Sequence, residues 1–216
     1  MLKRIKLCFI GNPNVGKSTL INRLLGANKL QISEHPGTTK NIIEKNLIWK
    51  EREFTLLDTA GVYKKKDFSF SLLTKAIKFS EIIILILDSS IDKLDKIHKK
   101  LASYTLKNGK GLIIIFNKWD LIKSKRNKKK ELEKFVKKEL PQFDEKELLF
   151  ISALRDEKFA KIFQFSIEIK KSLKSQMTTS NLNKWLRDII KFNPPIRIRG
   201  KEIKFKYIVQ TDTNPP

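Results

Sequence analysis

The amino-acid sequence predicts an α/β fold, a doubly wound and mostly parallel sheet with helices packed on both faces. Apolar runs of strand length alternate with longer amphipathic segments, which is typical of strand–helix–strand units. The run IIILIL at 82–87 has no polar interruption and indicates a strand buried on both faces. The glycine-rich turn at 11–18 lies between a predicted strand and a predicted helix, as in phosphate-binding loops.

The elements follow from hydrophobic periodicity and from turn residues. We expect strands at 5–10, 46–49, 54–57, 82–87, 112–116 and 148–151. We expect helices at 19–25, 70–79, 94–107, 128–140 and 158–172. The polar residues 31–41 and the basic residues 63–67 show neither the helical nor the strand spacing of apolar residues, so they are expected to form loops.

A second unit is expected after residue 174. Residues 171–180 are polar and aperiodic, which indicates a linker, and a helix at 180–191 and a strand at 203–209 follow. One helix and one strand cannot enclose a core. We therefore expect 1–174 to form the first domain and 175–216 to form a linker with an incomplete α+β domain.

The balance of charge predicts a polyanionic partner. The chain has 46 Lys and Arg against 23 Asp and Glu, a net charge of +23, which favours RNA. A general compositional bias toward lysine is the alternative, because the basic residues occur in helices and loops alike. No apolar run approaches the roughly 20 residues of a membrane span, so no membrane association is expected. The single cysteine, Cys8, cannot form a disulfide within the chain, which fits the cytoplasm.

Residues 11–18, GNPNVGKS, match the pattern G-x-x-x-x-G-K-[ST] of a phosphate-binding loop. Gly11 and Gly16 allow the sharp turn that points successive main-chain N–H groups at phosphate oxygens. Lys17 would reach the β- and γ-phosphates, and the Ser18 hydroxyl would hold Mg²⁺. A chance glycine-rich turn is the alternative. The residues expected to bind nucleotide here are Gly11, Asn12, Pro13, Asn14, Val15, Gly16, Lys17, Ser18 and Thr19.

A second polar turn, NKWD at 117–120, selects the base. The Asp120 carboxylate can accept hydrogen bonds from N1–H and the 2-amino group of guanine, and adenine has neither donor. Asn117 would hold the loop and contact N7, the Lys118 stem would lie along the purine, and main-chain N–H groups after strand 148–151 would reach O6. The predicted base-site residues are Asn117, Lys118, Trp119, Asp120, Ser152 and Ala153.

A third turn follows the strand at 54–57, at the sheet edge where ligands bind in open α/β folds. It consists of a carboxylate and a glycine-containing segment, DTAGV. The predicted nucleotide-site residues here are Asp58, Thr59, Ala60, Gly61 and Val62.

These motifs, with PGTT at 36–39 and the Ser-Ala pair at 152–153, resemble the five G-box motifs of translation-factor-type GTPases. The residues within the motifs resemble those of the Era/TrmE/EngA branch. The tail TTSNLNKWLRDIIKFNPP, followed by KFKYIVQTDTNPP, is similar to the start of the KH-like domain of the Der (EngA) family of ribosome-assembly GTPases. The resemblance implies a GTP-hydrolysing switch in large-subunit biogenesis, with ribosomal RNA or the large ribosomal subunit as partner. Family members carry two G domains, so the resemblance implies that the first is absent from this chain.

The resemblance also implies how hydrolysis would work. Mg²⁺ would be held by Ser18 and by a switch threonine, Thr39 or Thr38, with Asp58 acting through water. Lys17 and the Gly61 N–H would contact the γ-phosphate, and a K⁺ ion near Asn14 would act in place of an arginine finger. Asn14 as a plain turn residue is the alternative. Lys40 and Asn41 replace the family's basic–acidic pair, and the loop after DTAG is shorter than usual.

Two other functions remain open. The chain could be an RNA-binding module that uses GTP only as a structural ligand. It could also be another GTPase of the Era/TrmE type, membrane-associated or tRNA-modifying, although the NPP-containing tail and the lack of an amphipathic anchor argue against this.

Overall fold

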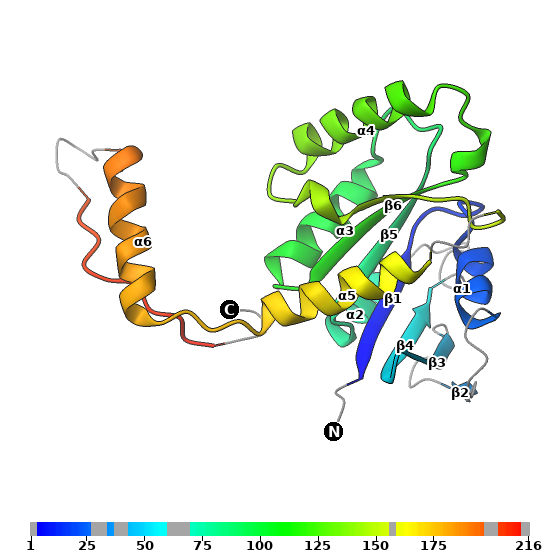
Figure 1. Ribbon diagram of the computed structural model, residues 1–216, viewed down its shortest axis with the longest axis horizontal. Helices are drawn as coiled ribbons and strands as arrows, with labels where there is room; N and C mark the ends of the chain where they lie inside the picture. The colour runs from blue at the N-terminus through cyan, green and yellow to red at the C-terminus, as the bar shows by residue number, and fades with distance from the viewer. Residues whose placement is uncertain are drawn as a thin grey trace. The chain divides into compact units, whose positions relative to one another are not determined.

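The computed structural model describes residues 4–26, 34–36, 43–59, 70–155, 159–196 and 203–212. The chain divides into two compact units, Met1–Lys170 and Lys171–Pro216. The first unit contains a seven-stranded sheet of order β2-β3-β4-β1-β5-β6-β7 (Figure 1). Its strands are β1 (Ile5–Ile10), β2 (Glu34–Pro36), β3 (Ile43–Trp49), β4 (Arg52–Asp58), β5 (Ile82–Asp88), β6 (Gly111–Asn117) and β7 (Leu148–Phe150).

The sheet is mostly parallel, as predicted. Strands β4, β1, β5, β6 and β7 pair in parallel, while β2–β3 and β3–β4 pair antiparallel. The β3–β4 hairpin closes through Lys50 and Glu51, whose φ angles of 45° and 61° match the turns that suit the twist of paired strands. The short strand β2 lies within the segment expected to be a loop, and its three residues carry no alternation from which a strand could be predicted.

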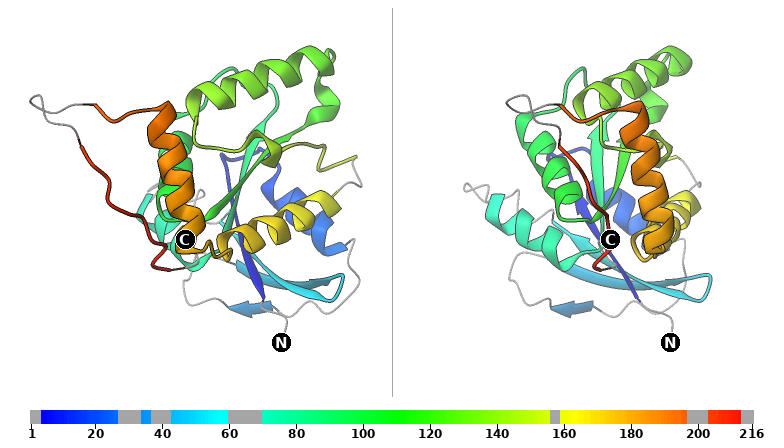
Figure 2. Two further views of the ribbon diagram at one scale, coloured as in Figure 1. Left: turned by 60° about the vertical axis from the view of Figure 1, so that its left-hand side comes forward. Right: turned by 90° about the vertical axis from the view of Figure 1, so that its left-hand side faces the viewer.

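Helices cover both faces of the sheet (Figure 2). One face packs against α2 (Phe70–Phe79), α3 (Lys96–Lys107) and α4 (Lys125–Glu139), and the other against α1 (Lys17–Gly26) and α5 (Ala160–Leu173). Alternate residues of β1 divide between the layers, because successive side chains of a strand point to opposite faces. Cys8 and Ile10 join the core beneath α2, α3 and α4. Burial raises the pKa of the Cys8 thiol to about 12, so this cysteine is an inert core residue.

The second unit contains α6 (Thr179–Phe192) and an extended segment at 203–212. The Thr178 hydroxyl caps α6 by accepting from the Asn181 N–H at 3.3 Å. The strand predicted at 203–209 is wrong, since no regular structure forms there. The Asn183 side chain instead donates to the Ile208 carbonyl at 2.9 Å and accepts from the Ile208 N–H at 3.1 Å. A side chain thus occupies the main-chain groups that a neighbouring strand would bind. Within the described ranges, no helix combines the length and apolarity that crossing a membrane requires.

Candidate nucleotide site

The phosphate loop joins β1 to α1, and its backbone admits only glycine at two positions. A Cβ atom on Gly11 would lie 2.3 Å from the Ile86 carbonyl oxygen of β5. Gly16 has a φ of 95°, and a Cβ there would lie 2.2 Å from Asn117 Nδ2. The glycines therefore let the loop pack directly against β5 and β6, and the loop leads into the N-terminus of α1, which favours anions.

Lys17 lies buried at the start of α1, with 5% of its surface exposed. Its Nζ donates to the carbonyl oxygens of Gly11 at 2.8 Å and Asn12 at 2.7 Å. Burial lowers the pKa of Lys17 to about 8, and the nearby charge of Asp58 partly opposes that shift. The ammonium group of Lys17 thus lies against the phosphate loop, in partly desolvated surroundings where it would bind an anion strongly.

Asp58 and Thr59 follow β4 at the same edge of the sheet. Asp58 pairs in register with Phe9 of β1 and is buried. The Thr59 hydroxyl donates to the Phe9 carbonyl at 2.6 Å, which anchors the turn. The other predicted residues of the switch segments lie outside the described residues: Thr38, Thr39, Ala60, Gly61 and Val62.

Asn117 at the end of β6 links three loops. Its Nδ2 donates to the Val15 carbonyl in the phosphate loop at 2.7 Å. Its Oδ1 accepts from the Ala153 N–H at 2.8 Å. These two bonds join the turn at 117–120 to the phosphate loop and to the segment after β7. The Ala153 N–H, which was predicted to reach the base, donates to Asn117 here.

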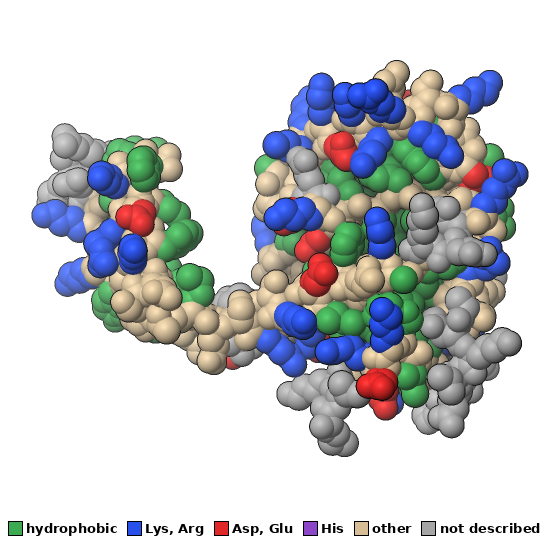
Figure 3. Space-filling view, in the orientation of Figure 1, with side chains coloured by type: hydrophobic (Ala, Val, Ile, Leu, Met, Phe, Trp, Pro, Cys, Tyr) green, Lys and Arg blue, Asp and Glu red, His purple; other side chains and the backbone are tan. Residues whose placement is uncertain are grey.

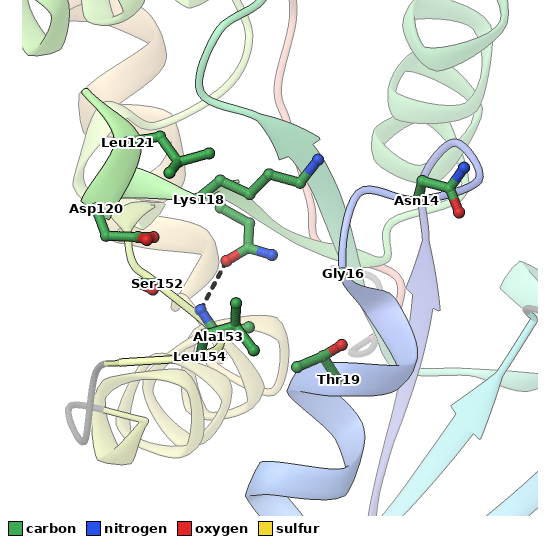
Figure 4. A pocket seen from close by; sticks show the side chains of 10 residues that line it. Asn14, Gly16, Thr19, Lys118, Asp120, Leu121, Ser152, Ala153 and Leu154 are labelled. Carbon is green, nitrogen blue, oxygen red and sulfur yellow. Dashed lines mark hydrogen bonds between the residues drawn. The ribbon is translucent and has the colours of Figure 1, made fainter.

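Lys118 has a left-handed backbone, with a φ of 62°, and its side chain extends along one side of the pocket (Figure 4). Its Nζ forms an ion pair of 2.7 Å with Asp88 Oδ2 at the end of β5. Burial raises the pKa of Asp88, but hydrogen bonds from Lys118 and Ser90 outweigh it and hold the pKa below its ordinary value. Asp88 was not predicted, although its position at the carboxyl end of a buried strand is a usable signal.

A pocket of about 200 Å³ lies between the phosphate loop and the turn at 117–120 (Figure 4). It is lined by Asn14, Gly16, Thr19, Asn117, Lys118, Asp120, Leu121, Ser152, Ala153 and Leu154. All but Leu121 and Leu154 were predicted from the motifs. The Arg23 guanidinium of α1 donates to the Leu154 carbonyl at 2.9 Å and so joins the two sides of the pocket.

Asp120 is the acceptor at one end of this pocket. A hydrogen bond with Ser152 lowers the pKa of Asp120, and Arg155 Nε lies 3.7 Å from Asp120 Oδ2. The carboxylate is therefore ionised at neutral pH and can accept two hydrogen bonds. Trp119 does not line the pocket; its ring packs on Phe150 at 4.7 Å between centroids.

Asp95, another residue that was not predicted, supports the phosphate loop from the start of α3. Its Oδ2 accepts from Asn12 Nδ2 at 2.7 Å and lies 3.8 Å from His98 Nδ1. His98 is buried, and desolvation lowers its pKa, with opposing charge effects from Asp95 and Lys17. Among the described residues, His98 Nε2 has no hydrogen-bond partner.

Comparison with known proteins agrees with this geometry. Residues 6–118 match the family described as 50S ribosome-binding GTPase, and residues 176–216 match the KH-domain-like C-terminal region of EngA bacterial GTPase enzymes. GTPase Der of Caldanaerobacter subterraneus subsp. tengcongensis is 33% identical over 219 residues, covering 98% of this chain and 50% of the relative. GTPase Der of Thermoanaerobacter sp. (strain X514) is 34% identical with the same coverage. The chain thus spans about half the length of the curated relatives it matches.

Solved structures show the same fold. Aquifex aeolicus Era Y63A bound to GDP.AlF4- aligns with a TM-score of 0.60 at 25% identity, over 77% of this chain and 57% of that one. Era in complex with MgGDPNP and a 16S ribosomal RNA fragment aligns with a TM-score of 0.61 at 24% identity, over 78% and 57%. On the family match and this shared fold, the chain belongs to the 50S ribosome-binding GTPases, and 98% of its length is similar to GTPase Der.

Proposed function

We propose that this chain binds guanine nucleotides and hydrolyses GTP to GDP and phosphate. One observation carries the proposal: a single pocket runs from Gly16 and Thr19 at the phosphate loop to Asp120 and Ser152 at the base end. Phosphates at the N-terminus of α1 and guanine beside Asp120 would occupy its two ends. We assign residues 1–174 to a G domain and 175–216 to a linker and KH-like segment; the division of the chain near residue 170 and the family matches support this assignment.

Catalysis would rest on positioning and charge neutralisation around the transferring phosphoryl group. The loop N–H groups would hold the phosphates, and Lys17 would exchange its bonds to the Gly11 and Asn12 carbonyls for bonds to phosphate oxygens. Water would attack in line with the leaving GDP oxygen. Thr38 or Thr39 would ligate Mg²⁺, and the Gly61 N–H would contact the γ-phosphate. Loss of the γ-phosphate on hydrolysis would release the segments around Thr38 and Gly61, which is the switch.

The residues at this edge fit a Mg²⁺ ion. Ser18 is exposed at the start of α1, Asp58 ends β4 nearby, and hydroxyl and carboxylate oxygens are the ligands that Mg²⁺ prefers. Mg²⁺ would neutralise charge on the β- and γ-phosphates.

A K⁺ ion is proposed beside Asn14, which has a φ of 62° at the turn of the phosphate loop and is one of the residues that line the pocket. An amide oxygen there could share a monovalent cation with the phosphates. We expect the hydrolysis rate to rise when Na⁺ is replaced by K⁺. Equal rates in the two salts, or an Asn14→Ala variant that keeps the K⁺ response, would exclude this role.

The proposed cellular role is in assembly of the large ribosomal subunit, with ribosomal RNA or the subunit as partner. It is supported by the family description and by the net charge of +23. A cytoplasmic location goes with this role and remains a prediction. The alternative, a module that uses GTP only as a structural ligand, predicts tight GTP binding without single-turnover hydrolysis.

The decisive experiment compares GTP, ATP and xanthosine triphosphate binding by the wild type and Asp120→Asn. The wild type should prefer GTP over ATP by orders of magnitude, because ATP leaves the carboxylate unpaired. Asp120→Asn should lose GTP affinity and gain affinity for the xanthosine nucleotide, whose 2-oxo group accepts a hydrogen bond. Asp144→Asn, a change at an exposed carboxylate outside the pocket, is the control. An unchanged preference in Asp120→Asn would overturn the base-site assignment.

A further inference from the structure

Helix α4, which follows the base-site turn, carries four exposed cations at intervals of four residues. We call them the α4 basic row: Arg126, Lys130, Lys134 and Lys138. Side chains four apart on a helix are neighbours on one face, so the row is a continuous stripe about 18 Å long. In Figure 3, blue side chains gather along the edge of the first unit where Figure 1 places α4.

The carboxylates of α4 do not neutralise this row, because lysines beside it bind them. Lys128 Nζ pairs with Glu131 at 2.8 Å and with Asp92 at 3.1 Å. Lys129 pairs with Glu133 at 3.6 Å, and Glu139 pairs with Lys99 of α3. Among the described residues, none of the ion pairs found includes a member of the α4 basic row. The charge of the row is therefore available to a partner.

The opposite side of α4 belongs to the core of the first unit. Leu132 and Val136 are buried there, and the row itself includes no apolar side chain. A helix that lies in a membrane surface inserts large apolar residues on its contact face, which this face does not offer. The chemistry fits a hydrophilic polyanion, and mobile lysine ammonium groups suit phosphate oxygens that need no fixed geometry.

We propose that the α4 basic row binds the phosphate backbone of RNA. This inference rests on the proposed function, which makes RNA the polyanion. The contacts would be independent of sequence, because Lys and Arg at phosphates set position rather than base identity. None of the four residues lines the nucleotide pocket, so RNA and nucleotide bind at separate places.

The test replaces Lys130, Lys134 and Lys138 together by Gln and compares this triple variant with a matched one. The control is Lys96→Gln, Lys100→Gln and Lys107→Gln, three exposed lysines of α3, which removes the same charge. Binding of a fluorescent RNA hairpin with a 20-base-pair stem is measured by anisotropy over a series of KCl concentrations. GDP affinity, measured in parallel, should stay at the wild-type value in both variants.

We expect the α4 variant to lose roughly tenfold in RNA affinity near 0.1 M salt, and the slope of log K against log salt to fall by about 2. The α3 control should change affinity by less than about threefold. Equal losses in both variants would show that net charge alone acts, and an unchanged α4 variant would exclude the row. A loss of binding to phosphatidylserine vesicles with intact RNA binding would assign the row to a membrane surface and overturn the proposal.

These results can be separated from failure of the proposed function. RNA binding through the row in a protein that neither binds nor hydrolyses GTP would reject the GTPase proposal alone. Normal GTP hydrolysis with an unchanged α4 variant would reject the row alone.

Discussion

Asp95 occupies the N-cap position of α3 but binds Asn12 of the phosphate loop instead of its own helix. Its side chain makes no capping hydrogen bond, whereas its Oδ2 accepts from Asn12 Nδ2 at 2.7 Å. An aspartate at this position usually accepts from the second or third N–H of its helix. Here the carboxylate connects α3 to the first turn of the nucleotide site.

Replacing Asp95 by Ala should therefore loosen the phosphate loop. We expect GDP affinity to fall several-fold, in line with about 1 kcal/mol for a lost hydrogen bond, mainly through faster dissociation. Stopped-flow release of a fluorescent GDP analogue measures this rate. Asp92→Ala, an exposed carboxylate ahead of the same helix that pairs with Lys128, is the control and should release GDP at the wild-type rate. Equal rates in Asp95→Ala and wild type would show that the Asn12 contact does not hold the loop.

Gly16→Ala should abolish nucleotide binding. The added methyl would overlap Asn117 Nδ2 at 2.2 Å, and the φ of 95° is unfavourable for alanine. The displaced Asn117 would lose its bonds to both flanking loops. Gly26→Ala, where a Cβ meets nothing within 4 Å, is the matched control and should keep the wild-type affinity and melting temperature. GDP titration by calorimetry distinguishes the two, and a Gly16→Ala protein that binds normally would contradict the described loop.

Nucleotide binding should be linked to proton uptake by Lys17. The pKa of Lys17 is depressed to about 8, so the folded empty protein releases this proton as pH rises past 8. Bound phosphate would favour the charged ammonium and raise the pKa again. Proton uptake on GDP binding should therefore grow between pH 7 and pH 8.5, as measured by calorimetry in two buffers of different ionisation enthalpy. Cys8→Ala should show the same uptake, since the Cys8 thiol does not titrate in this range.

Glu147→Gln should stabilise the protein at pH 8 but not at pH 5. Burial and, to a smaller extent, the nearby charge of Asp144 together raise the pKa of Glu147 to about 7. The stability contributed by the protonated group is present below its ordinary pKa of 4.5 and is lost as pH rises through 7. Because Glu147 is only half-buried, we expect roughly 1 kcal/mol, or 2–4 °C in melting temperature. Glu168→Gln on the exposed face of α5 is the control, and an equal gain at both pH values would refute the assignment.

The sequence predicted the sheet well because its central strands are marked by local pattern. β5 and β6 are continuous apolar runs, so burial on both faces could be inferred before pairing was known. The prediction of a strand at 203–209 was wrong because local pattern does not show whether a pairing strand is present. Alternation predicts a strand only where another strand is available to pair, and the described part of the second unit supplies Asn183 instead.

The residues of the candidate site likewise fall into a predicted group and a group that was not predicted. The pocket residues that carry motif spacing were predicted, whereas those that depend on tertiary approach were not. Asp95 and Asn12 are 83 positions apart, and Arg23 and Leu154 are 131 apart, so no local spacing connects either pair. Asp120 and Ser152 were predicted from the motifs, whereas Arg155, whose Nε lies 3.7 Å from Asp120 Oδ2, was found only in the fold.

The double hydrogen bond of Asn117 has a consequence for nucleotide exchange. One amide group spans from Val15 to Ala153, so the two ends of the pocket cannot open one at a time without breaking it. An exchange factor that displaces either loop would therefore weaken the contacts of the protein with the base and with the phosphates at the same time. Guanosine alone or pyrophosphate alone, each touching one end, should be poor competitors compared with the intact molecule that uses both.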